Sequence, residues 1–247
     1  METNLSGKNI FITGGTGSIG RALIEQFSDA GGNVFFQYKD NNERAEDLEQ
    51  RFGARPFNID FLRDYSFPSE DFDVVVNNAG INLTKHLAHE VSTEEWQQTI
   101  KVNLETPFKI IIRYLPHMMR MRWGRIINIS SIFGLRATTK NLPYNVSKHG
   151  LSGLTKSIAK EYANFGVTCN EICPGAVESE LMNRIAMQKE REAGIAHEDY
   201  LRAAREAIPA KELASPQGIA DLAVFLASDK ASHINGASIV IDGGEIA

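Results

Sequence analysis

The chain has 247 residues, of which 43% are hydrophobic and 23% are charged, and α/β folds often reach this length as one domain. Its formal net charge of −5 and the lack of a basic run argue against nucleic-acid partners. No basic segment followed by an apolar stretch opens the chain, and no apolar run approaches the ~20 residues that span a bilayer, so we expect a cytoplasmic protein without a membrane partner.

The first predicted unit is a strand, a glycine-rich turn and a helix. Residues 8–13 form a short apolar run that indicates a buried strand, and residues 18–30 show a helical pattern. Between them stands Gly-Gly-Thr-Gly-Ser-Ile-Gly at 14–20. Glycines there let the backbone approach a pyrophosphate, which would bind at the helix N-terminus. A glycine cluster alone could be only a tight turn, but the flanking elements favour dinucleotide binding.

Strands and helices are predicted to alternate along the rest of the chain, without a linker, repeat or low-complexity segment. The other strands are expected at 33–38, 54–59, 73–77, 125–130, 167–172 and 238–241. The other helices are expected near 41–52, 93–121, 143–164, 178–206 and 216–228. Near-continuous apolar strands separated by helices indicate a parallel sheet that is covered on both faces. The sequence therefore predicts an α/β fold with a single domain over 1–247.

Tyr144 and Lys148 stand four residues apart in the predicted helix 143–164, and Ser131 lies thirteen residues before Tyr144. One helical turn would place the phenol and the ammonium on the same face. A nearby cation favours phenolate, so we expect the pKa of Tyr144 to fall below its reference of about 10. A tyrosine tuned in this way can protonate a developing alkoxide. An ordinary amphipathic helix surface is the alternative for this pair alone.

The two cysteines, Cys169 and Cys173, lie in the predicted strand 167–172 or directly after it. Their even spacing would put both side chains on one face. Cysteines without nearby histidine partners make a poor zinc site, and the six histidines form no motif with metal-ligand spacing. We expect no metal site and two buried, reduced packing residues.

In chain order, these motifs resemble the short-chain dehydrogenase/reductase family over nearly the whole chain. The segments similar to family landmarks are Thr13–Gly20, Asn77–Gly80, Asn103, Gly124–Ser131, Pro174–Gly175 and Asp242–Gly244. One departure is Ser18, which stands where the single-domain branch usually has glycine. The resemblance implies a Rossmann-like, doubly wound sheet of seven parallel strands with helices on both faces.

The resemblance also implies four catalytic residues. Tyr144 would give a proton to the carbonyl oxygen in reduction or remove it in oxidation. Lys148 would lower the tyrosine pKa and bind the nicotinamide ribose. Ser131 would hold the substrate oxygen, and Asn103 would support a water chain that feeds Lys148.

A cofactor site follows from the same resemblance. Asp60 would meet the adenine amino group, and Ser179 replaces a threonine that often contacts the cofactor. The implied cofactor-binding residues are Gly14, Thr16, Gly17, Ser18, Ile19, Gly20, Tyr38, Lys39, Asp60, Asn78, Ala79, Gly80, Tyr144, Lys148, Pro174, Gly175, Val177 and Ser179.

The end of the second predicted strand bears on the choice between NADP and NAD. Tyr38 stands where NAD-preferring relatives carry an acidic residue, which would bind the ribose 2′-hydroxyl and repel a 2′-phosphate. Lys39 offers a cation to that phosphate, although a solvated surface lysine is the alternative. Some NADP-preferring relatives also have a basic residue where this chain has Gly17. We expect NADP in preference to NAD.

The sequence leaves two classes of substrate open. Residues 180–211 correspond to the substrate lid of the family and are longer than in 3-oxoacyl-[acyl-carrier-protein] reductases, which the chain otherwise resembles most. Arg122 matches a basic position that meets the acidic carrier, but Phe165 stands where a second arginine is common. A carrier-bound carbonyl substrate and a free sugar, polyol, hydroxy acid or steroid-like alcohol both remain open.

Three function classes follow from these features. An NAD(P)-dependent oxidoreductase that interconverts a ketone and a secondary alcohol is favoured, because the four catalytic residues are complete. A noncatalytic dinucleotide sensor would keep the glycine loop but would have no need for all four. A structural subunit would require neither the glycine loop nor the four catalytic residues. The resemblance further implies a homotetramer built through helices near 104–121 and 148–164.

Overall fold

The computed structural model describes residues 3–63, 65–83 and 85–247. Its strands form one parallel sheet in the order β3-β2-β1-β4-β5-β6-β7. Their bounds are β1 (Asn9–Ile12), β2 (Asn33–Tyr38), β3 (Arg55–Asn58), β4 (Val74–Asn77), β5 (Gly124–Ile129), β6 (Val167–Pro174) and β7 (Ser238–Ile241). The seven-stranded, Rossmann-like parallel sheet implied by the resemblance is confirmed.

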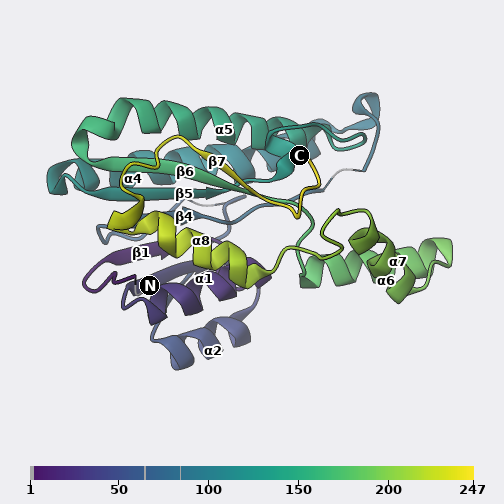
Figure 1. The fold of residues 1–247 in the computed structure, drawn as a ribbon, viewed down its shortest axis with the longest axis horizontal. Coiled ribbons are helices and arrows are strands. Elements are labelled where there is room, and N and C mark those ends of the chain that lie inside the picture. Colours follow the sequence, from purple (N-terminus) through teal and green to yellow (C-terminus); the bar gives the residue numbers. More distant parts are fainter. Residues whose placement is uncertain (1–2, 64, 84) are drawn as a thin grey trace.

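Helices cover both faces of the sheet. The helices are α1 (Ser18–Asp29), α2 (Asn42–Phe52), α3 (Thr93–Ile100), α4 (Thr106–Met121), α5 (Leu142–Tyr162), α6 (Glu180–Ala193), α7 (His197–Glu206) and α8 (Pro216–Ala227). Figure 1 shows α1, α2 and α8 on one side of the sheet and α4 and α5 on the other. Helices α6 and α7 project beyond one end of the strands.

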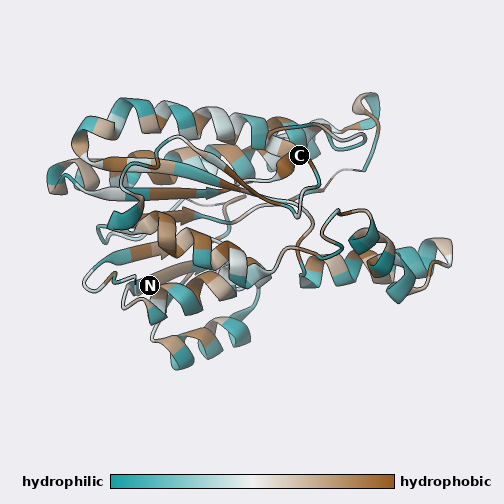
Figure 2. Ribbon diagram, in the orientation of Figure 1, coloured by the Kyte–Doolittle hydropathy of each residue, from teal (hydrophilic) through white to brown (hydrophobic). Residues whose placement is uncertain are grey.

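The strands alternate their side chains between two hydrophobic cores, as the period of two in a strand requires. Ile10 and Ile12 of β1 pack with α1 and α8, whereas Phe11 between them packs with α4. All three side chains are fully buried. In Figure 2 apolar residues gather along the strands, and the outer turns of α2, α6 and α7 carry many hydrophilic residues. The sheet is therefore packed against a hydrophobic core on each face.

Two predicted helices are interrupted in the structure. The helical run expected at 93–121 consists of α3, a π-helical segment (Lys101–Glu105) and α4. The helix expected at 178–206 is two helices, because Gly194 ends α6 with a left-handed φ of 68°. Glycine takes this conformation without the steric cost that a Cβ would bring. None of the described helices is both long and apolar enough to cross a bilayer.

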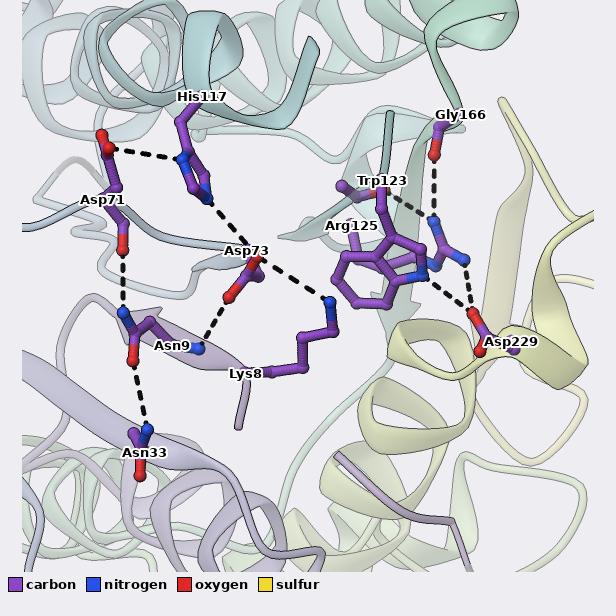
Figure 3. Close-up of polar contacts among 11 residues, drawn as sticks. Lys8, Asn9, Asn33, Asp71, Asp73, His117, Trp123, Arg125, Gly166 and Asp229 are labelled. Atoms are coloured by element: carbon purple, nitrogen blue, oxygen red, sulfur yellow. Dashed lines mark hydrogen bonds and ion pairs between the residues drawn. The ribbon is translucent and has the colours of Figure 1, made fainter. Parts of the chain in front are cut away.

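At the amino ends of the strands lies a network of charged and aromatic side chains, drawn in Figure 3. Asp73 accepts a hydrogen bond from the backbone N–H of Asn9 at 2.9 Å and lies 3.4 Å from His117 Nε2. The buried Arg125 pairs with Asp229 at 3.2 Å, and Trp123 Nε1 donates to the same carboxylate at 2.8 Å. These contacts join β1, β5, α4 and the short 3₁₀ helix after α8 (Asp229–Ala231) at the edge opposite the glycine turn.

Candidate active site

The glycine-rich turn after β1 is tied to the segment that follows β4. The Thr13 hydroxyl accepts the backbone N–H groups of Asn78 and Ala79, both at 2.9 Å. The Asn78 side chain in turn donates to the Thr13 carbonyl at 2.8 Å. Gln37 of β2 accepts the N–H of Gly14 at 2.9 Å. The turn is thus held from two neighbouring strands at the carboxyl edge of the sheet.

The turn leaves the N-terminus of α1 open to the cavity. Gly17 is the N-cap residue and offers no side chain, and no acidic residue occupies the first helical turn. A Cβ on Gly20 would overlap the Gly14 carbonyl oxygen, and one on Gly15 would overlap the Phe36 ring. Unsatisfied N–H groups and the helix dipole make such an end attractive to an anion. The turn therefore fits a dinucleotide pyrophosphate.

A cavity of about 1160 Å³ runs from this turn past the end of β4 to α5 and α6. All the residues implied for the cofactor line it, namely Gly14, Thr16, Gly17, Ser18, Ile19, Gly20, Tyr38, Lys39, Asp60, Asn78, Ala79, Gly80, Tyr144, Lys148, Pro174, Gly175, Val177 and Ser179. Ser131 lines it as well. The structure therefore brings the implied cofactor residues and three of the four implied catalytic residues to one space.

Ser131 and Tyr144 meet through their side chains. Ser131 follows β5 and caps a short 3₁₀ helix (Ile132–Gly134), where its hydroxyl accepts the N–H of Phe133 at 3.2 Å. Tyr144, in the first turn of α5, lies close enough to the Ser131 hydroxyl for this hydroxyl to lower the pKa of its phenol. One strand end and one helix start thus present two hydroxyls together in the cavity wall.

The pKa of Tyr144 differs from the sequence prediction. Burial raises it, and the hydrogen bond to Ser131 opposes that rise. The ammonium of Lys148 lies 5.6 Å from the centre of the Tyr144 ring, and its Nζ donates to the Ile129 carbonyl at 2.8 Å. The predicted lowering by Lys148 is therefore wrong for this structure, because the desolvated ring outweighs a cation that is bonded elsewhere.

Lys148 itself is buried, with 4% of its surface exposed. Burial lowers its pKa to about 8, while the nearby Glu171 carboxylate acts in the opposite direction. Glu171 is fully buried and accepts a hydrogen bond from Ser152 at 2.9 Å. An ammonium with a pKa in this range can exchange a proton near neutral pH, which is the range that suits acid–base catalysis.

Asn103 does not line the cavity but stands directly behind it. The π-helical segment directs its side chain between the loop after β4 and α5. Its Nδ2 donates to the Ile81 carbonyl at 2.8 Å and to Ser147 Oγ at 3.1 Å, and its Oδ1 accepts the Ile81 N–H at 2.8 Å. A Cβ on Gly80 would lie 3.5 Å from Asn103 Oδ1 and 3.7 Å from Lys148 Nζ. Asn103 thus joins the two segments that flank Lys148.

At the far end of the cavity, Lys39 and Asp60 form an ion pair of 3.4 Å. Asp60 also accepts the N–H of Leu62 at 3.0 Å. Tyr38 lines the same corner and leaves it without a carboxylate at the end of β2. A ribose 2′-substituent would enter this corner, because the last residue of the second strand reads that position in dinucleotide-binding folds.

Two residues of the site, Gln37 and Arg44, lie outside the motifs recognised in the sequence. Gln37 holds the glycine turn, and its Nε2 also donates to the Ile59 carbonyl at 2.5 Å. Arg44, in the first turn of α2, lines the cavity and donates to the Thr16 carbonyl at 3.0 Å. A basic residue in the first turn after the second strand was a usable signal for Arg44. No periodicity marked Gln37, which lies inside an otherwise apolar strand.

The predicted lid segment forms the outer wall of the cavity. Ser179 caps α6 by accepting the N–H of Met182 at 3.2 Å. The Ser18 hydroxyl accepts the N–H of Glu180 at 3.2 Å, so the departure from glycine at this position links the glycine turn to α6. A bridge between Val177 and Ala214 closes the base of the segment. The apolar residues that face the cavity from α6 are Leu181, Met182, Ile185 and Met187.

Both cysteines are free and buried, as predicted. Burial raises the pKa of Cys173 to about 12, so its thiol is protonated and unreactive at neutral pH. Within the described ranges, no group of three or more His, Cys, Asp and Glu side chains could hold a metal ion.

Comparisons with known proteins point in one direction. A family model described as enoyl-(acyl carrier protein) reductase matches residues 14–245. The 3-oxoacyl-[acyl-carrier-protein] reductase of Aquifex aeolicus is 33% identical over 99% of both chains. The D-beta-hydroxybutyrate dehydrogenase of Rhizobium meliloti is 33% identical over 96% of this chain and 98% of its own. The structure of L-sorbose reductase from Gluconobacter frateurii, complexed with NADPH and L-sorbose, matches with a TM-score of 0.90 and 27% identity over 100% of this chain and 99% of its own.

Proposed function

We propose that the catalytic residues of this chain are Asn103, Ser131, Tyr144 and Lys148. The chain belongs to the short-chain dehydrogenase/reductase family. The chain is an NAD(P)-dependent oxidoreductase that interconverts a ketone and a secondary alcohol. The observation that carries the residue assignment is that Ser131, Tyr144 and Lys148 line one cavity. The open N-terminus of α1 lines the same cavity.

Each residue has a distinct task in the proposed reaction. Ser131 donates a hydrogen bond to the substrate oxygen, and Tyr144 gives that oxygen a proton in reduction or removes it in oxidation. Lys148, whose pKa is about 8, holds positive charge beside the phenol and binds the cofactor ribose. Asn103 holds the loop after β4 against α5 beside Lys148. The bound nicotinamide cofactor would supply or accept the hydride.

We propose NADP(H) as the preferred cofactor. Tyr38 places no carboxylate at the end of β2, so the 2′-phosphate meets no repulsion there. Lys39 lies beside it with 47% of its side chain exposed and can turn from Asp60 to the phosphate. The L-sorbose reductase structure that this chain resembles contains NADPH, which agrees with this choice.

For the substrate we propose a 3-oxoacyl compound or the corresponding 3-hydroxy acid. Leu181, Met182 and Ile185 give the cavity an apolar wall that suits an acyl chain. Lys85 lines the cavity too, and its pKa is lowered first by burial and then by the charge of Lys189 on α6. A lysine at this place in the cavity wall suits a substrate that carries an anionic group. The Aquifex aeolicus and Rhizobium meliloti relatives are both named for this class of substrate.

A ketone panel tests the proposal with NADPH and NADH in parallel. It contains a 3-oxoacyl carrier protein, the same acyl group on a small thiol, acetoacetate and L-sorbose. We expect turnover of a 3-oxo compound, and the first two members tell whether a carrier is required. Turnover of L-sorbose alone would favour a sugar reductase instead. Binding of a dinucleotide without turnover of any ketone would favour the noncatalytic sensor.

We further propose a cytoplasmic homotetramer. Phe108, Ile112 and Met121 on α4 expose 45%, 47% and 57% of their surface, and Val146 on α5 exposes 38%. Such side chains on two helices of one face suit symmetric contacts between copies. Light scattering at micromolar concentration should report four chains, and a monomer would contradict this assembly.

A further inference from the structure

Glu180, the first residue of α6, reaches back to two helices of the dinucleotide-binding half. Its Oε1 lies 2.9 Å from Arg44 Nη2, and its Oε2 accepts from Arg44 Nη1 at 3.1 Å. Its Oε1 also accepts from Arg21 Nη2 of α1 at 3.0 Å. The contact with Arg44 is therefore bidentate, the arrangement in which a guanidinium binds a carboxylate or a phosphate most strongly.

Arg44 stands where a 2′-phosphate would arrive. It lines the cavity beside Lys39, and its Nη1 donates to the Thr16 carbonyl of the glycine turn at 3.0 Å. The charged side chains that line the cavity are Lys39, Asp40, Arg44, Asp60, Lys85, Lys148, Glu180 and Arg184. Lys39 is already paired with Asp60 at 3.4 Å. Arg44 is the cavity-lining arginine that contacts the glycine turn, and Glu180 occupies the edge of its guanidinium that a phosphate would use.

Building on the proposed function, we propose that Arg44 selects NADP(H) by its 2′-phosphate and that Glu180 competes with the phosphate for Arg44. Two anions cannot share one guanidinium edge without mutual repulsion. Arrival of the phosphate thus transfers Arg44 from the carboxylate to the cofactor. Arg21 does not line the cavity and keeps a partner for Glu180 after the exchange. The specificity of the site is set by this competition as well as by the residues at the end of β2.

The competition explains two features of the sequence. Gly17 leaves the glycine turn without the basic residue that some NADP-preferring relatives have there, and Arg44 supplies the charge from α2 instead. Ser18 fixes the position of Glu180, because its hydroxyl accepts the Glu180 N–H at 3.2 Å. The carboxylate is therefore held within reach of Arg44 by a contact that glycine would not make.

Binding of fragments without a nicotinamide tests the proposal apart from catalysis. Calorimetry would compare adenosine 2′,5′-bisphosphate with adenosine 5′-monophosphate, and cofactor fluorescence would compare NADPH with NADH. Arg44→Gln should reduce the preference for the 2′-phosphate about tenfold, the range for loss of a charge-assisted hydrogen bond. Glu180→Gln should increase the same preference about threefold to tenfold, because it removes the competing charge.

Matched controls carry the same charge changes outside the corner. Arg51→Gln alters another arginine of α2, which pairs with Asp47 at 3.3 Å on the surface. Glu190→Gln alters an exposed glutamate near the other end of α6. Both variants should keep the preference for the 2′-phosphate within about twofold of the wild-type value, because exposed charges at a distance have little effect.

The double variant Arg44→Gln, Glu180→Gln decides whether the two residues act together. If Glu180 acts by holding Arg44, the gain from Glu180→Gln should shrink when Arg44 is absent. An equal gain with and without Arg44 would overturn the competition. Equal weakening of NADPH and NADH by Arg44→Gln would overturn the inference and leave the proposed function intact. Failure of the wild-type protein to bind either dinucleotide would overturn both.

Discussion

Tyr144→Phe tests the proposed proton donor most directly. The substitution removes the hydroxyl beside Ser131 and keeps the ring that lies 5.6 Å from Lys148 Nζ. Loss of a general acid should lower kcat by about 10²- to 10⁴-fold, which corresponds to roughly 3–5 kcal/mol of transition-state free energy. Loss of one hydrogen bond should change the free energy of unfolding by only about 1 kcal/mol. The substitution should therefore reduce kcat strongly while the free energy of unfolding changes little.

The assay is steady-state reduction of the best ketone of the panel, with cofactor affinity and urea unfolding measured on the same preparation. Tyr162→Phe is the matched control, because Tyr162 ends the same helix and does not line the cavity. It should retain near-normal kcat. If Tyr144→Phe kept more than about a tenth of the wild-type kcat, well above the range for a general acid, Tyr144 would not be the proton donor.

Three further predictions concern the buried lysine, the cofactor corner and the lid. Lys148→Met should abolish turnover yet raise the free energy of unfolding at pH 7 by about 2 kcal/mol. A pKa lowered from 10.5 to about 8 means that the charged lysine destabilises the folded state by roughly 3 kcal/mol. The variant removes this cost but also loses a hydrogen bond that contributes about 1 kcal/mol. The unfolded chain keeps this proton up to about pH 10.5 whereas the folded one releases it near pH 8, so wild-type stability rises across that window and the variant's advantage shrinks; urea unfolding at pH 7 and pH 10 checks this, and a less stable variant at pH 7 contradicts it. Lys39→Ala should weaken NADPH several-fold more than NADH in equilibrium titrations, and equal losses would mean that Lys39 does not bind the phosphate. In hydrogen exchange, protection of residues 180–211 should rise when cofactor and substrate bind, whereas protection equal to that of β5 without ligand would indicate a permanently packed pair of helices.

The sequence predicted the parts of the site that depend on local geometry. A spacing of four residues in a helix put Tyr144 and Lys148 on one face, and a strand, glycine turn and helix put Gly14 to Gly20 at the cavity. The break after α6 was also available, because Gly194 follows a last turn that contains Arg191, and this order is a helix C-terminus signal. The single helix expected at 178–206 overlooked that signal.

Other features depend on contacts that no local pattern contains. The side chain of Asn103 has its direction because a π-helical segment shifts the register between α3 and α4. Arg44 and Glu180 meet across 136 positions of the chain. The pKa of Tyr144 depends on how many elements bury the phenol, and this burial outweighed the cation that the sequence placed nearby. In each case the missing information was tertiary packing.

The two ends of the sheet show why connectivity, and not charge alone, locates the site. The amino end has the network around Asp73 and Arg125, whose charges are paired within the protein (Figure 3). At the carboxyl end, β1 and β4 are neighbours, yet the chain leaves them for opposite faces of the sheet, toward α1 and toward α4. Such a divergence opens a crevice in a parallel α/β sheet. Asn78 bridges it by donating to the carbonyls of Thr13 and Gly14 at 2.8 and 3.2 Å. The cavity continues from this bridge to Tyr144, so the strand order would bring a bound dinucleotide beside the proposed proton donor.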